Sequence, residues 1–287
     1  MILLEKVETR EQLKTLLKTI AKELFDGRDE TTDRARGCTR FAVGLAKKTV
    51  LANACGALAD SLLLTDAAIG SASQLAENLA ALSNTPALAL WIGIIAYAFQ
   101  IYFDFSGYSD MAIGMGRIFG FKYPENFRLP YTSRSITEFW RRWHISLSSW
   151  LKDYLYISLG GNRKGRARTY ANLMLTMLLG GLWHGAAVRF ILWGALHGAA
   201  LAVHKALMHA FPSVFKASGE QMRPWRRVLG VLVTFHVVCL GWILFRAPDM
   251  HTGERILSQI FGHFQWRLIP QVVSGYGAVM ALMAAGY

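Results

Sequence analysis

His184 is the residue whose type and surroundings point most directly to chemistry. It stands in the segment LLGGLWHGAAVRF, where its neighbours are mostly apolar or small. An ionisable group inside an apolar membrane segment is costly and therefore indicates a functional site. Burial disfavours the charged imidazolium, and a general base needs an uncharged ring. We expect the nearby Gly180, Gly181 and Gly185 to leave space for a substrate, although a structural histidine bonded between helices is the alternative.

His144 is the second candidate, in the amphipathic segment EFWRRWHISLSSWL. A histidine in such a segment has either a chemical role or a position at the membrane interface. Ser146 and Asp153 follow closely in the chain. Proximity in sequence does not establish a Ser-His-Asp triad, so we predict none.

Other ionisable residues allow more than one interpretation. His197 and His204 lie seven residues apart on one helical face, but zinc sites need three or four ligands, and we predict no metal site. Asp104 and Asp110 end an apolar segment. They either form an ion path in a transporter or pair with the basic loop that follows in the chain.

Positive charge is concentrated in residues 117–168, which hold eleven basic and three acidic side chains. Such a segment beside membrane spans is typical of a cytoplasmic loop. It lacks a nucleic-acid-binding motif, so we expect contact with lipid headgroups or with the phosphates of a cytosolic substrate. The residues concerned are Arg141, Arg142, Arg163, Lys164 and Arg166.

The elements that position these residues are apolar. The chain is 53% hydrophobic and 17% charged, whereas soluble domains have about 45–50% and about 25%. Residues 86–105 match the roughly 20 residues needed to cross a bilayer. Further apolar segments occur at 40–64, 107–121, 170–183, 186–211, 228–245 and 270–287. Residues 135–159 favour one re-entrant or interfacial helix, between loops at 122–134 and 160–168.

These patterns predict an all-α, polytopic helical membrane protein with about six embedded segments. Residues 1–37 are expected to form a charged cytoplasmic arm, with an amphipathic helix over 5–25 and a polar linker over 26–36. Residues 38–287 form the membrane-embedded core. The core is expected to be partial and truncated at its N-terminus. We assign no chemistry to the three scattered cysteines.

Four segments together resemble the membrane-bound O-acyltransferase family: DFSGYSDMAIGMGRIFGF, NFRLPY, FWRRWHISLSSWLKDYLYISLGGNRKG and GGLWHG. The resemblance covers about residues 38–287. It is strongest to the bacterial polysaccharide branch, which includes alginate and peptidoglycan O-acetyltransferases, with teichoic-acid D-alanine transferases as cousins. Members of this branch usually have further spans before the region that matches residue 38.

The resemblance implies a helical core with a funnel or tunnel reaching a buried histidine. His184, in the WHG motif, and His144, in the WHISLS motif, match the catalytic positions, and His197 matches a recurring histidine of less defined role. It also implies an acyltransferase of the bacterial inner membrane. A cytoplasmic thioester, acetyl-CoA, is the expected donor, with no bound cofactor. The expected acceptor is an exported polysaccharide such as alginate, or a periplasmic relay protein.

We accordingly predict six substrate-binding residues besides the two histidines. They are Arg141, Arg142, Asn162, Arg163, Lys164 and Trp183. Two other functions stay open from the sequence. One is an ion- or proton-coupled transporter subunit, and the other is an inactive truncated scaffold.

Overall fold

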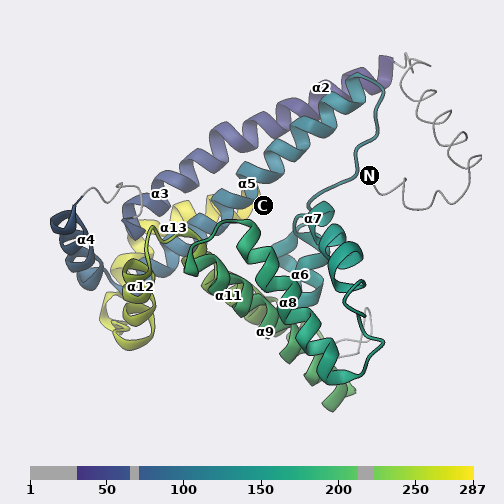
Figure 1. The fold of residues 1–287 in the computed structure, drawn as a ribbon. Coiled ribbons are helices and arrows are strands. Elements are labelled where there is room, and N and C mark those ends of the chain that lie inside the picture. Colours follow the sequence, from purple (N-terminus) through teal and green to yellow (C-terminus); the bar gives the residue numbers. More distant parts are fainter. Residues whose placement is uncertain (1–30, 65–70, 213–222) are drawn as a thin grey trace, which may run out of the picture. The chain divides into compact units, whose positions relative to one another are not determined.

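The computed structural model describes residues 31–64, 71–212 and 223–287, and every regular element within them is a helix (Figure 1). The prediction of an all-α fold is confirmed. The amphipathic helix predicted over 5–25 lies outside the described residues. The predicted linker over 26–36 is wrong for residues 31–36, because they form the start of the first described helix and the boundary at residue 37 falls inside it.

The described helices follow one another along the chain. They are α2 (Thr31–Ala46), the π-helical η2 (Lys47–Ala52), α3 (Asn53–Leu63), α4 (Ala72–Asn84), α5 (Ala87–Ile118), the 3₁₀ turn η3 (Pro130–Thr132), α6 (Ile136–Arg142), α7 (Ile145–Trp150), the π-helical η4 (Leu151–Tyr156), α8 (Arg166–Trp183), α9 (Val188–Ala210), α11 (Pro224–Arg246), α12 (Met250–Gly262), the 3₁₀ turn η6 (Trp266–Leu268) and α13 (Ile269–Gly286).

Three of the described helices, α5, α9 and α11, are long and apolar enough to cross a membrane. The prediction of about six embedded segments also counts shorter and interfacial ones, so it stays a prediction beyond these three helices. The segments predicted separately at 86–105 and 107–121 are one continuous helix, α5, of 32 residues. The glycines in its second half do not interrupt it.

The chain divides into two compact units, and residues 31–50 and 103–125 belong to the first. Here α2 lies along the second half of α5, and glycines let the two backbones meet (Figure 1). A Cβ on Gly37 would lie 2.8 Å from the carbonyl oxygen of Gly114, and one on Gly44 would lie 2.5 Å from that of Gly107. Such small residues are the usual means of close helix packing in membranes.

Ion pairs reinforce the same contact. Asp110 accepts hydrogen bonds from Arg40, with an Nε–Oδ1 distance of 2.8 Å, and from Lys47, with an Nζ–Oδ2 distance of 2.7 Å. Asp104 pairs with Lys48. Both carboxylates are paired, but the predicted partner was wrong, because the cations come from α2 and η2 and not from the basic loop. The pairing gives no support to the transporter interpretation.

The second unit contains residues 51–102 and 126–287, and α8 and α9 form its tightest helix pair. A Cβ on Gly194 would lie 2.3 Å from the carbonyl oxygen of Met177, and one on Gly198 would lie 2.9 Å from the sulfur of Met174. The two glycines thus set how closely α9 approaches α8. Helix α11 packs on the same α9.

The single helix predicted over 135–159 is wrong, because the structure breaks it into α6, α7 and η4. The break falls at Trp143 and His144. Ser135 caps α6 by accepting a hydrogen bond from the Glu138 amide at 3.2 Å. This short first helix then ends before the turn that carries His144.

We predict that Gly194→Ala destabilises the α8–α9 pair by about 1–3 kcal/mol, because the added methyl group overlaps the Met177 carbonyl. Thermal unfolding of the purified chain in detergent measures this effect. Gly275→Ala on α13 is the matched control, since nothing lies within 4 Å of a Cβ there. Equal unfolding temperatures for the two variants would contradict the assignment.

Candidate active site

His144 occupies a strained turn between α6 and α7. Its φ of 43° and ψ of 58° lie in the left-handed region, which non-glycine residues adopt rarely and at a cost of about 1–3 kcal/mol. Asn126 holds the two residues that follow His144. The Ile145 amide donates to the backbone oxygen of Asn126, and the Ser146 amide donates to its Oδ1, each at 3.0 Å.

Asn126 also determines which nitrogen of His144 is basic. Because the Ser146 backbone N–H can only donate, the Asn126 side-chain atom facing it is the oxygen. That same Oδ1 lies 3.3 Å from His144 Nδ1, so Nδ1 carries the hydrogen in this contact. Nε2 is then the basic nitrogen of the ring.

Ser146 is oriented by the same asparagine. Its Oγ donates to Asn126 Oδ1 at 3.0 Å and lies 3.3 Å from His144 Nδ1. A protonated Nδ1 cannot take the Ser146 proton, and Asp153 pairs weakly with Lys152 at 3.7 Å. The arrangement orients His144 and is not a Ser-His-Asp triad.

His184 lies in the turn between α8 and α9, outside the three candidate spans. Aromatic rings enclose its imidazole. The ring centroids of Trp183, Trp193 and Phe245 lie 5.1, 5.3 and 5.1 Å away, all with edge-to-face geometry, and Phe190 lies at 6.3 Å. The ring is thus held by packing in an apolar environment.

Both histidines are poised in the uncharged form. Burial lowers the pKa of His144 to about 4, and the neighbouring charge of His184 contributes in the same direction. Burial alone lowers the pKa of His184. An uncharged imidazole is the state that accepts a proton.

The expectation that glycines leave substrate space beside His184 is wrong for two of the three. A Cβ on Gly181 would lie 2.2 Å from the Phe190 carbonyl oxygen, and one on Gly185 would lie 2.9 Å from the Phe190 ring. A Cβ on Gly180 would lie 3.4 Å from Leu151 Cδ1, which is an ordinary contact distance. These glycines admit neighbouring protein atoms.

A continuous set of aromatic contacts connects the two histidines. Phe127 stacks on His144 at 6.3 Å and contacts Trp143 at 5.1 Å. Trp143 contacts Trp242 at 5.1 Å, Trp242 contacts Trp193 at 6.4 Å, and Trp193 reaches His184. Sequence reasoning missed Asn126, Trp193 and Trp242. Asn126 begins the quoted NFRLPY segment, which was a usable signal, whereas the two tryptophans lie in ordinary apolar runs.

His197 is completely buried behind this set of rings, 4.8 Å from Trp193 and 5.2 Å from Trp140. A Cβ on Gly241 would lie 2.8 Å from its Nε2, so glycine is needed there. His204 has a different partner, the Thr137 hydroxyl at 2.9 Å. No group of three metal-ligating side chains occurs in the part of the chain that the structure describes.

The structure brings one of the six predicted substrate-binding residues, Trp183, to His184. Arg142 binds Glu138 at 2.6 Å, and Asn162 Oδ1 accepts from Tyr156 and Lys205 at 2.5 and 2.6 Å. The remaining three, Arg141, Arg163 and Lys164, are exposed.

The turn that holds Asn162, Arg163 and Lys164 precedes α8, whereas His184 follows α8. The 18 residues of that helix span about 27 Å. The structure therefore does not bring this basic turn to His184.

Comparison with known proteins agrees with this architecture. Residues 68–242 match the membrane-bound O-acyltransferase family. The chain is 48% identical to the probable alginate O-acetylase AlgI of Pseudomonas aeruginosa, over 85% of this chain and 42% of that protein. It is 42% identical to the peptidoglycan O-acetyltransferase of Helicobacter pylori, over 79% and 39%, and 30% identical to the teichoic acid D-alanyltransferase of Bacillus subtilis, over 61% and 45%.

The chain thus spans less than half the length of these relatives. The family match runs from before α4 into α11 and includes both turns that carry the candidate histidines. With three helices able to span a membrane and a matching region of 175 residues, the chain is a membrane protein that belongs to the membrane-bound O-acyltransferase family.

Proposed function

We propose that the chain provides the proton-transfer centre of an O-acetyltransferase in a bacterial inner membrane. The donor would be a cytoplasmic thioester, acetyl-CoA, and the acceptor a hydroxyl of an exported polysaccharide or of a periplasmic relay protein. The names of the relatives support acetylation of alginate or peptidoglycan as the class of reaction. The observation that carries the proposal is the hydrogen bond from His144 Nδ1 to Asn126 Oδ1, which leaves Nε2 as the basic nitrogen, together with the ring contacts that connect this turn to His184.

In the proposed reaction the acceptor oxygen attacks the thioester carbonyl, while its proton passes to His184. The carbon–sulfur bond then breaks, and His184 returns the proton to the leaving thiolate. His144 would orient the acceptor, since its basic Nε2 can accept a hydrogen bond from the hydroxyl. Its Nδ1 hydrogen is directed to Asn126, so oxyanion stabilisation by that hydrogen is disfavoured.

Arg141, Arg163 and Lys164 remain candidates for the donor's phosphates. Their exposure suits contact with a soluble, highly charged molecule. The basic turn and His184 lie at opposite ends of α8, so an extended donor would have to cover the length of that helix. A long, flexible thioester donor meets this requirement better than a compact one.

We predict that His184→Ala lowers acetyl transfer by about 10²–10⁴-fold, the usual contribution of a general base. Transfer from radiolabelled acetyl-CoA to membrane glycan, or hydrolysis in its absence, measures the effect. His251→Ala is the control, because that histidine is exposed on α12. Full activity of the His184 variant would remove this residue from the mechanism.

The measurement needs a second format, because the chain spans 42% of the Pseudomonas aeruginosa relative. We suggest exchanging the matching region of that relative for this chain and testing the same two variants. If the chimera is active and the isolated chain is inactive, the catalytic residues lie in this chain, and it needs the remaining part of the relative for activity. Inactivity of both would contradict the proposal.

We predict an activity that is constant above about pH 6.5 and declines only at lower pH. Both histidines have lowered pKa values, so they stay uncharged at and above the ordinary value of 6.5. Asn126→Asp places a carboxylate beside Nδ1, which favours the imidazolium and shifts the acidic decline to higher pH. Asn84→Asp on α4, far along the chain, is the control. An unchanged pH profile for Asn126→Asp would contradict the assigned contact.

A further inference from the structure

Residues 261–267, the aromatic turn, join the end of α12 to the start of α13. They include the two most exposed large hydrophobic side chains of the described residues, Trp266 at 73% and Phe261 at 69%. Phe264 is the third aromatic residue, and its ring centroid lies 4.5 Å from that of Trp266. None of the three belongs to a candidate membrane span. Such an exposed apolar cluster marks a contact surface, because large apolar groups are unfavourable in water.

Contacts on both sides of the aromatic turn place it beside the start of α5. Before the turn, Gln259 Nε2 donates hydrogen bonds to the carbonyl oxygens of Ser83 and Thr85, at 3.0 and 3.2 Å. These two residues shortly precede α5. After the turn, Val272 in the first turn of α13 packs in one hydrophobic cluster with Ala89 in the first turn of α5.

Helix α13 runs along α5 in the same direction. At its end, the ring centroid of Tyr287 lies 5.0 Å from that of Tyr102 and 5.5 Å from that of Phe99. The two helices therefore advance together from Val272 and Ala89 toward these rings. They begin at the same level, and the aromatic turn lies at that level.

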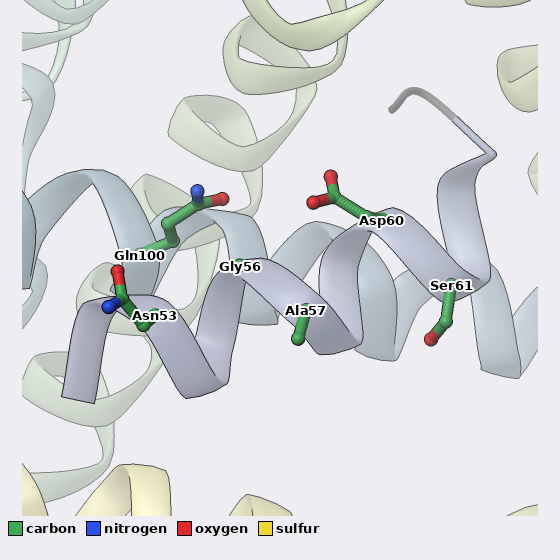
Figure 2. A pocket seen from close by; sticks show the side chains of 6 residues that line it. All are labelled: Asn53, Gly56, Ala57, Asp60, Ser61 and Gln100. Carbon is green, nitrogen blue, oxygen red and sulfur yellow. The ribbon is translucent and has the colours of Figure 1, made fainter. Parts of the chain in front are cut away.

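Helix α3 runs along the same part of α5 in the opposite direction. Gly56 near its start meets Gln100 (Figure 2), and Leu62 near its end meets Gly93. Residues 87–103, the first half of α5, contain no charged side chain. Because α5 is long and apolar enough to cross a membrane, this uncharged half belongs in the hydrocarbon and its start marks a membrane boundary. The aromatic turn lies beside that boundary.

The composition of the aromatic turn suits phospholipid headgroups. Tryptophan combines an apolar ring with an N–H donor, and it is enriched where acyl chains meet headgroups. Arg267, which is exposed, directly follows Trp266, and His263 is exposed as well. Residues 260–270 contain no carboxylate that would repel a lipid phosphate. The charge of the turn is therefore complementary to anionic headgroups.

Helix α12 has different flanks on the two sides of its buried face. Ile256 and Ile260 are buried, and the helix packs on α4 (Figure 1). Leu257 and Phe261, four residues apart, follow one flank, whereas Arg255 is exposed on the other. Phe261 thus continues an apolar flank, and Arg255 is a nearby cation that points away from it.

We propose that the aromatic turn is a lipid anchor, in which Phe261 and Trp266 insert at the level of the headgroups and Arg267 binds the phosphate of an anionic phospholipid. Lipid contact here does not require acyl transfer, so failure of one proposal leaves the other standing. The anchor would fix the depth at which α5 and α13 enter the membrane. The turn is joined to α13 directly and to the start of α5 through Gln259.

The test records tryptophan fluorescence of the full chain in lipid nanodiscs. Their phospholipids carry bromine, a short-range quencher, either near the headgroup or near the end of the acyl chain. The chain has nine tryptophans, so subtracting the spectrum of Trp266→Phe isolates the emission of Trp266. We expect bromine near the headgroup to quench this emission at least roughly twofold, and bromine near the chain end to quench it less.

Two other outcomes would overturn the proposal. Quenching of Trp266 by acrylamide in the water, without quenching by brominated lipid, would place the ring in solvent. Quenching by neither reagent would place it against a protein partner.

Lipid selectivity tests the role of Arg267. Nanodiscs of one composition carry bromine either on phosphatidylglycerol alone or on phosphatidylcholine alone. We expect brominated phosphatidylglycerol to quench Trp266 roughly twofold to fivefold more strongly, the preference that one cation gives at a membrane surface. Arg267→Gln should abolish this preference, and Arg255→Gln, on the other flank of α12, should keep it. Equal quenching in the unaltered chain, or a preference that survives Arg267→Gln, would overturn the phosphate contact.

Discussion

The candidate active site depends on the hydrogen bonds that Asn126 accepts from the turn after α6. These bonds hold the Ile145 and Ser146 amides and so maintain a left-handed residue at His144. Without them the chain would favour a continuous helix, since the surrounding sequence has strong helical periodicity. One asparagine therefore fixes the backbone and the tautomer of the histidine at once.

Around this turn, ring packing replaces hydrogen bonding as the means of positioning. His184 is located by four aromatic side chains, and His197 is buried among others with neither ring nitrogen bonded among the described residues. Aromatic contacts restrain orientation without supplying charge. They surround the imidazole of His184 with apolar groups, and this burial lowers its pKa and favours the uncharged state. The close α8–α9 approach at Gly194 supports the same arrangement, because Trp193 is its neighbour on α9.

Sequence reasoning predicted the helical class, the position of the apolar segments and the family, because hydropathy and ordered motifs are local signals. It failed where tertiary contacts decide. The break at His144 follows from hydrogen bonds to Asn126, eighteen residues earlier. Gly181 and Gly185 accommodate Phe190 instead of a substrate. The sequence could not predict this contact, because it depends on where α9 packs. Charge alone could predict that Asp110 is paired, but it could not predict that its partners are Arg40 and Lys47. The roles of His144 and His184 in catalysis stay predictions.

The length of α5 has a consequence for the surrounding lipid. Its 32 residues extend about 48 Å, against about 30 Å of hydrocarbon in a typical bilayer. Tilting alone would require about 50°, which exceeds the usual range of about 0–40°. Part of α5 therefore projects beyond the hydrocarbon, and local bilayer thickness decides how many of its turns are wetted. Asp104 and Asp110, in its second half, are paired with Lys48 and with Lys47, and this pairing lowers the cost of placing that half close to the hydrocarbon.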